Sequence, residues 1–270
     1  MVNSSSTETA DLLFVGDGDR VYWNSLGVTN GLLNAAQLEL GIDDTIKREI
    51  GSRILRPSRG VPSLQFSDWL RGFVQGTGVE TRTVNAKVED VFQRFVDGSR
   101  PEDIVYPDVA SHITSLQDDG RVDVLLHTAG PDIQQEAKKA ASKLDIAHVV
   151  SVSPSKAENH HRWAHRRNGL ITPKLSRLST RTVRPARFIV LADDKGIAFT
   201  GQGGERVGGF NVVRPEEYSE ADIARSILEM RPVGGVMVMR GLEGVAAHLF
   251  AAIDHPNDSE MLKIFWNTKK

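Results

Sequence analysis

The chain of 270 residues contains no cysteine. This absence excludes disulfide bonds, thiolate metal sites and cysteine nucleophiles. Histidine and carboxylate side chains are therefore the expected metal ligands.

The sequence also has no long hydrophobic run and no excess of one charge. No segment approaches the roughly 18 consecutive apolar residues of a membrane helix, and the opening MVNSSSTETA lacks the basic region and apolar core of a secretory signal. We expect a cytoplasmic protein with a polar tail over residues 1–10. The net charge of −2 creates no overall field for nucleic acid or an anionic membrane. A basic stretch at residues 172–187 contains no aromatic side chain for stacking a base, so we expect neither partner.

Short apolar runs recur along the chain and predict strands. The clearest are residues 12–15, 122–126 and 188–192, followed by 147–152 and the weaker 211–213 and 235–238. Nearly continuous apolar runs of this length are typical of parallel strands buried on both faces. Helical patterns at residues 108–120, 132–144 and 156–168 lie between them. The alternation predicts an α/β fold with a doubly wound parallel sheet.

One segment interrupts the alternation, because residues 24–98 are helical in pattern with no convincing strand. Helices are expected over residues 30–40, 44–54, 67–74 and 84–96. The length suits one large α/β domain that carries an insertion. The predicted division is a core of residues 11–22 and 99–270, with a helical insertion of residues 23–98.

Polar side chains follow the predicted strands at the edge where an open α/β sheet binds ligands. The first apolar run opens the stretch LLFVGDGDR, in which Asp17 and Asp19 follow it. The candidate site residues along the chain are Asp17, Asp19, Thr128, Lys156, Asp193 and Asp194. Clustered carboxylates repel one another unless a cation lies among them, and a site made of oxygen ligands suits Mg²⁺. Thr128 could donate a hydrogen bond to a phosphoryl oxygen, and Lys156 could neutralise developing charge. A carboxylate near the phosphorus can act as a nucleophile and form an aspartyl-phosphate.

The order of these motifs resembles that of the haloacid dehalogenase (HAD) superfamily: Asp-x-Asp, then Thr, then Lys, then paired Asp. The resemblance covers roughly residues 11–225, and residues 105–131 resemble that family's return from a helical cap into the core. It implies a Rossmann-like core with an inserted α-helical cap. It also implies that Asp17 is the nucleophile and Asp19 the general acid/base.

The resemblance assigns roles to the other candidates as well. Thr128 and the adjacent Ala129 would bind the phosphoryl group, and Lys156 would hold nucleophile and phosphate together. A Mg²⁺ ion would be held by the metal-site residues Asp17, Asp19 (through its main-chain carbonyl), Asp193 and Asp194.

The implied function is a Mg²⁺-dependent phosphatase that acts on a small phosphorylated metabolite. Asp19 favours phosphate transfer, because family members that cleave carbon–halogen bonds generally lack an acid there. Two alternatives stay open: a catalytically impaired binding or regulatory protein, and a phosphomutase or dehalogenase of the same superfamily. No feature of the sequence specifies an oligomeric state.

Several residues depart from the family pattern or compete for its roles. Gly16 stands where an apolar residue is usual, and Arg20 stands where the turn usually has glycine. Arg20 could distort the loop, or it could place a cation over the site and bind the substrate. Lys138 and Lys139 compete with Lys156 for the role of active-site lysine. Two further arginines near a Pro/Gly turn could bind a second anionic group of a substrate or lie on a solvated surface: Arg53 and Arg56.

Overall fold

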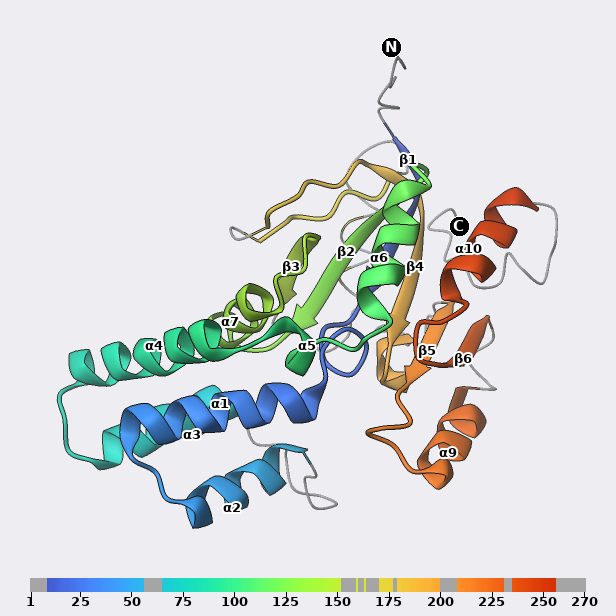
Figure 1. Cartoon of the computed structure of the whole chain (residues 1–270). Coiled ribbons are helices and arrows are strands. Elements are labelled where there is room, and N and C mark those ends of the chain that lie inside the picture. Colours follow the sequence, from blue (N-terminus) through green and yellow to red (C-terminus); the bar gives the residue numbers. More distant parts are fainter. Residues whose placement is uncertain are drawn as a thin grey trace. The chain divides into compact units, whose positions relative to one another are not determined.

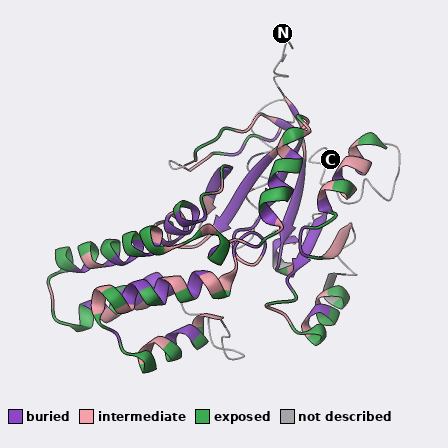
Figure 2. Ribbon diagram, viewed as in Figure 1, coloured by how far each residue is buried: buried purple, intermediate pink, exposed green. Residues whose placement is uncertain are grey.

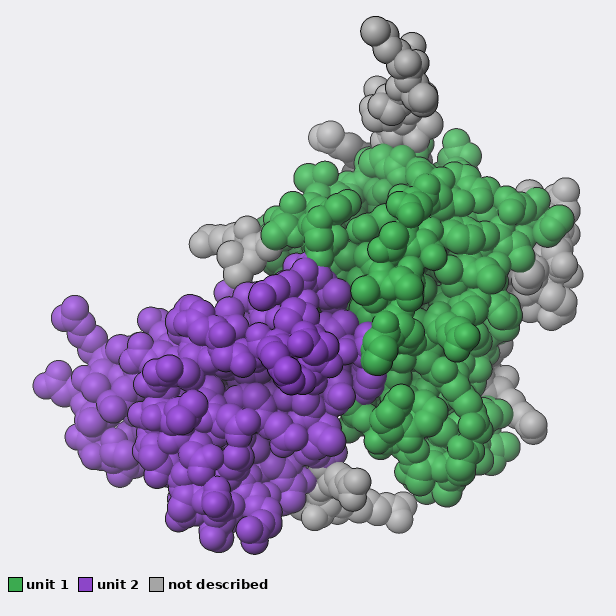
Figure 3. All heavy atoms as spheres, viewed as in Figure 1, with its two compact units in different colours: residues 1–22, 107–129, 145–270 green, residues 23–106, 130–144 purple. Residues whose placement is uncertain are grey.

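The computed structural model describes residues 9–55, 65–151, 159, 163, 170–176, 179–199, 208–230 and 235–255 (Figure 1). The chain divides into two compact units, shown in different colours in Figure 3. Unit 1 comprises residues 1–22, 107–129 and 145–270, and unit 2 comprises residues 23–106 and 130–144. None of the helices in the described part of the chain has the length and apolar character that a membrane crossing requires.

Unit 1 is built on a six-stranded sheet with the order β3-β2-β1-β4-β5-β6. Every neighbouring pair of strands is parallel. The strands are β1 (Ala10–Gly16), β2 (Val122–Ala129), β3 (Ala147–Ser151), β4 (Ala186–Asp193), β5 (Gly209–Val213) and β6 (Val236–Arg240). All six predicted strands are present, and the predicted α/β fold with a Rossmann-like parallel sheet is confirmed.

The apolar runs are nearly continuous because the central strands are covered on both faces (Figure 2). On one face, Leu13 and Val15 of β1 belong to a buried cluster that includes Phe199. On the other face, the ring of Phe14 packs edge-on against His112, with 5.0 Å between ring centroids. A strand buried in this way has no solvated side on which polar residues could alternate.

The helical elements of unit 1 whose bounds lie within the described residues are α6 (Val109–Asp118), the short 3₁₀ helix η1 (Gly196–Phe199), α9 (Glu220–Met230) and α10 (Val245–Asp254). The helix predicted over residues 108–120 is present as α6. The helix predicted over residues 156–168 lies outside the described residues apart from positions 159 and 163.

The basic stretch before β4 forms ion pairs with carboxylates of unit 1. Arg184 contacts Asp123 at 2.7 Å, and Arg181 contacts Asp145 at 2.5 Å. These side chains therefore stabilise the turns around the sheet.

The regular elements in the described part of unit 2 are helices, apart from an isolated antiparallel bridge between Trp23 and Val105. Its helices are α1 (Ser25–Leu40), α2 (Asp44–Leu55), α3 (Phe66–Gly76), α4 (Thr81–Gly98), α5 (Pro101–Ile104) and α7 (Asp132–Ser142). Helix α1 begins before the predicted residue 30 because the Asn24 side chain caps it, accepting a hydrogen bond from the Gly27 amide at 3.0 Å. The ring of Phe66 packs edge-on against Phe92 at 5.9 Å. The predicted insertion of residues 23–98 lies wholly within this unit, which also contains residues 99–106 and α7; the predicted domain boundaries themselves stay a prediction.

Candidate functional site

The register of the sheet aligns the ends of its central strands. Gly16 of β1 pairs with Leu126 of β2 and with Ala192 of β4. The residues that follow these positions therefore emerge at one edge of unit 1, the carboxyl edge of the parallel strands. Asp17 follows β1 there, and Asp193 ends β4.

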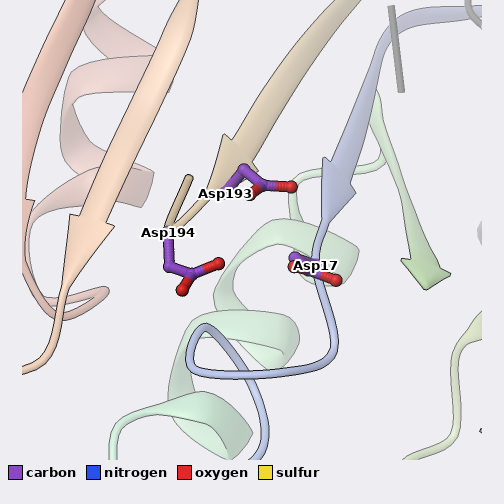
Figure 4. A group of neighbouring side chains, drawn as sticks. All are labelled: Asp17, Asp193 and Asp194. Carbon is purple, nitrogen blue, oxygen red and sulfur yellow. The ribbon is translucent and has the colours of Figure 1, made fainter. Parts of the chain in front are cut away.

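Three carboxylates converge at this edge: Asp17, Asp193 and Asp194. Each offers an oxygen within 4.8 Å of the others, and their exposed fractions are only 6 %, 1 % and 5 %. Figure 4 shows Asp17 just beyond β1, with the carboxylates of Asp193 and Asp194 directed towards the side on which Asp17 lies. Of the metal-binding residues predicted from the sequence, these three are the side chains that the fold brings together.

Backbone hydrogen bonds position the first two carboxylates. The Asp17 amide donates to the carbonyl of Ala192 at 2.8 Å, which fastens the end of β1 to β4. The Gly18 amide donates to Oδ1 of Asp17 at 2.6 Å, and the Lys195 amide donates to Oδ1 of Asp193 at 2.9 Å. Asn211 of β5 donates its side-chain amide to the carbonyl of Asp193 at 3.1 Å.

Asp194 is held through one oxygen alone. Its Oδ2 accepts a hydrogen bond from the hydroxyl of Tyr218 at 2.7 Å, whereas its buried Oδ1 has no hydrogen-bond partner within the described part of the chain. Burial raises the pKa of Asp194, and the neighbouring Asp17 adds to that rise against the opposing charge of Lys195. The negative charge of Asp194 in turn raises the pKa of the exposed Lys195.

These features fit a divalent cation. A buried carboxylate oxygen with no donor is costly unless a proton or a cation satisfies it. The ligand set consists of oxygens without cysteine or histidine, which suits Mg²⁺ better than zinc or copper. Asp17, Asp193 and Asp194 would hold the ion.

The loop after β1 is compact and tied to β5. The Tyr22 amide donates to the carbonyl of Gly18 at 3.1 Å and closes one helical turn around Asp19. Arg214, which follows β5 and is buried, donates to the carbonyl of Val21 at 2.5 Å and to Asp108 at 2.7 Å. Asp19 is thus carried on a loop whose backbone is fixed beside the three carboxylates.

Gly16, the first departure from the family pattern, has a local explanation. A Cβ atom at this position would lie 2.4 Å from Cζ of Tyr22, and Tyr22 is fully buried. The tyrosine ring occupies the space that an apolar side chain at position 16 would need.

Arg20, the second departure, has a backbone φ of +63°. This left-handed conformation favours glycine and costs an arginine about 1 kcal/mol. Its guanidinium Nη1 donates to the hydroxyl of Tyr218 at 2.7 Å, and its Nε lies 3.0 Å from a carboxylate oxygen of Glu217. Nη1 is also 3.7 Å from Oδ2 of Asp194. The side chain predicted to contact substrate is therefore engaged with the segment after β5.

Thr128 and Ala129, the predicted phosphoryl-binding residues, end β2 at the same carboxyl edge. Thr128 is buried and lies two residues beyond Leu126, the partner of Gly16. Lys156, the predicted lysine of the site, lies outside the described residues.

The remaining candidates lie in or near the helical unit. Lys138 and Lys139 are buried on α7: the ammonium of Lys138 lies 5.5 Å from the ring centroid of Trp23, and Lys139 donates to the carbonyl of Leu144. Arg53 is exposed near the end of α2, and Arg56 lies outside the described residues. Their predicted roles in substrate binding stay predictions.

Sequence reasoning missed Tyr218 and Asn211. Both belong to β5 or the turn that follows it, and β5 was among the weaker predicted strands. The rule that drew attention to the ends of the other strands applies to β5 as well. The available signals were Asn211, a polar residue within the predicted strand, and the polar residues after residue 213.

Comparisons with known proteins identify the fold. No protein-family model and no curated protein matches the sequence. Among solved structures, a protein classed as a haloacid dehalogenase-like hydrolase from Burkholderia xenovorans LB400 matches with a TM-score of 0.53 and 16% identity, over 88% of this chain and 96% of the other. The chain has the haloacid dehalogenase-like fold.

A second solved structure has the same HAD-like fold. A protein assigned as a beta-phosphoglucomutase from Thermotoga maritima matches with a TM-score of 0.51 and 16% identity, over 88% of this chain and 98% of the other. The resemblance to the HAD superfamily that the sequence predicts is thus confirmed at the level of fold.

Proposed function

We propose that the protein is a Mg²⁺-dependent phosphatase that hydrolyses a small phosphorylated metabolite. The observation that carries this proposal is the convergence of Asp17, Asp193 and Asp194 within 4.8 Å at the carboxyl edge of β1 and β4. The HAD-like fold supports it, since this edge is where open α/β sheets bind ligands. Mg²⁺ bound there would offset the charge of the carboxylates and polarise the phosphoryl oxygens.

In the proposed reaction, a carboxylate oxygen of Asp17 attacks the phosphorus and forms an aspartyl-phosphate, while the bond to the leaving oxygen breaks. Asp19 donates its proton to that oxygen, so that the product leaves as an alcohol. Asp19 then removes a proton from water, and the resulting hydroxide attacks the phosphorus. Inorganic phosphate departs and the Asp17 carboxylate is restored.

The other residues of the proposal bind and orient. The Thr128 hydroxyl would donate a hydrogen bond to the transferring group beside Ala129, and Lys156, proposed from the sequence alone, would balance its charge. Arg53 and Arg56 are proposed contacts for a second anionic group. The Gly18 amide, which donates to Asp17 Oδ1, keeps the nucleophile oriented.

The first test is phosphate release from an aryl phosphate such as p-nitrophenyl phosphate, with and without Mg²⁺. We expect turnover in the presence of Mg²⁺ and a fall of at least about a thousandfold in Asp17→Asn, because an amide cannot form the acyl phosphate. Asp90→Asn, at an exposed position of α4, is the matched control and should retain activity. Turnover by Asp17→Asn near the wild-type rate would refute the proposed nucleophile.

A second candidate function, metal-dependent binding without turnover, is favoured by the contact of the Arg20 guanidinium with Asp194. It predicts that the wild-type protein binds Mg²⁺ and beryllium fluoride, a mimic of the phosphoryl group, but releases no phosphate from a broad panel of metabolites. Analysis of the products would separate hydrolysis from phosphomutase or dehalogenase chemistry, which share the nucleophile.

A further inference from the structure

We propose that Arg20 and Tyr218 form a clamp that positions the Asp194 carboxylate, so that its free oxygen faces the metal. The clamp would make these two residues positioning residues for Mg²⁺ binding. This inference rests on the metal-dependent function proposed above and deepens it.

The first part of the clamp is the contact between Arg20 and Tyr218. The guanidinium Nη1 donates to the phenolic oxygen at 2.7 Å, and the guanidinium carbon lies 5.1 Å from the centroid of the tyrosine ring. The second partner, Glu217, lies next to Tyr218 in the chain and holds Nε at 3.0 Å. Arg20 is thereby held by two consecutive residues of the turn between β5 and α9.

The second part is the direction of the tyrosine proton. Since the phenolic oxygen accepts a hydrogen bond from Arg20, the hydroxyl proton is available to the other neighbour, Asp194. That proton is donated to Oδ2 at 2.7 Å. Arg20 therefore acts on the carboxylate mainly through Tyr218, with its own Nη1 further away at 3.7 Å.

The third part is the asymmetry of Asp194. Its Oδ2 is occupied by the clamp, and its Oδ1 is buried without a hydrogen-bond partner among the described residues. Asp17 and Asp193 offer carboxylate oxygens within 4.8 Å. A carboxylate fixed in this way presents one oxygen in a defined orientation, which lowers the entropic cost of binding a cation. Hydrogen bonds to the ligands of a metal commonly change its affinity by 10–100-fold.

A second contact, made by Arg214 after β5, fixes the backbone of the loop that carries Arg20. Arg214 donates to the carbonyl of Val21, the residue after Arg20. The contact joins the same two segments, the loop after β1 and the residues after β5. The position of Arg20 over Tyr218 is therefore set by the backbone as well as by its side-chain partners.

The experiment measures the dissociation constant for Mg²⁺ by calorimetry in the full-length protein. We expect Tyr218→Phe, which keeps the ring and removes only the hydroxyl, to raise this constant by about tenfold or more. Arg20→Gly suits the left-handed backbone at this position and should also raise it. The double variant should bind no more weakly than the weaker single variant, because Arg20 acts through Tyr218.

Tyr22→Phe is the matched control, since it removes a buried hydroxyl that has no hydrogen-bond partner in the described structure. It should leave the dissociation constant within twofold of wild type. Asp193→Ala, which removes the carboxylate of a proposed metal ligand, should abolish binding and thereby show that the calorimetric signal comes from this site.

The outcomes separate the clamp from the proposed function. A wild-type protein that binds Mg²⁺ while Tyr218→Phe binds it equally well would overturn the clamp and leave the metal-dependent function standing. Tighter binding by Arg20→Gly would also overturn it, because the arginine would then act only as a repelling charge. A wild-type protein that binds no Mg²⁺ would refute the metal-dependent function, and the clamp with it.

Discussion

Replacement of Gly16 by alanine tests whether the glycine before the candidate nucleophile is needed to seat Tyr22. The added methyl carbon would lie 2.4, 2.5 and 2.7 Å from Cζ, the hydroxyl oxygen and Cε2 of the tyrosine. Carbon atoms in contact are normally about 3.5–4.0 Å apart. The ring would therefore have to retreat by about 1 Å, and Tyr22 is 0% exposed, so it has no open space to enter.

Overpacking of this kind costs about 1–3 kcal/mol in the free energy of unfolding. In a protein of this size each kcal/mol lowers the melting temperature by roughly 2–4 °C. Gly72→Ala is the matched control, because Gly72 lies exposed within α3 with no atom near its Cβ position. There alanine should leave stability unchanged or raise it by up to about 1 kcal/mol, because it is the better helix former.

A double-mutant cycle with Tyr22→Leu isolates the contact between the two residues. Leucine lacks the three atoms that the new methyl group would meet. Urea unfolding should show that Gly16→Ala costs clearly less in the Tyr22→Leu background than in wild type. An equal cost in both backgrounds would refute the idea that Tyr22 selects glycine at position 16.

Two further predictions concern buried polar side chains of unit 1. Burial lowers the pKa of His112 to about 4 from its ordinary value of 6.5, with Asp108 and Arg214 acting in opposite directions. The unfolded chain therefore binds a proton that the folded protein excludes between these pH values, and stability should fall by up to about 3 kcal/mol as the pH drops from 6.5 to 4. Urea unfolding across this range should show a shallower pH dependence in His112→Phe, and identical slopes would contradict the assignment. Arg214→Met should lower the free energy of unfolding by about 3 kcal/mol, because it leaves Asp108 and a loop carbonyl without their guanidinium. Arg225→Met, which removes an exposed arginine, is its control and should change stability by less than about 0.5 kcal/mol.

The strands and the three carboxylates were predictable because they depend on local properties of the chain. Strands buried on both faces need nearly continuous apolar runs, and these runs are visible without knowledge of their neighbours. The ends of parallel strands meet at one edge, so acids after residues 16 and 192 could be grouped before the strand order was known.

The surroundings of these acids could not be predicted, because they depend on contacts between distant parts of the chain. Arg20 and Tyr218 are 198 positions apart, and their hydrogen bond exists only because β5 lies next to β4 and β4 next to β1. The grouping of α7 with the helical unit is a similar case. Its pattern predicts a helix, but its buried face includes Gln134 and Lys138, which hydrophobic periodicity does not recognise as buried.

Arg20 shows how a departure from the pattern of the HAD superfamily can preserve the local backbone and bring a cation close to Asp194. Its φ of +63° is the conformation that glycine would adopt, so the change of side chain need not distort the turn. The contacts of the Arg20 side chain must offset the strain of its left-handed backbone. These contacts are made with Tyr218 and Asp194. The loop after β1 can therefore form with arginine at position 20, because its backbone keeps the left-handed conformation that glycine would adopt. The effect of Arg20 on function should instead appear in the affinity of the three carboxylates for a cation, which is the quantity that replacement of Arg20 and Tyr218 measures.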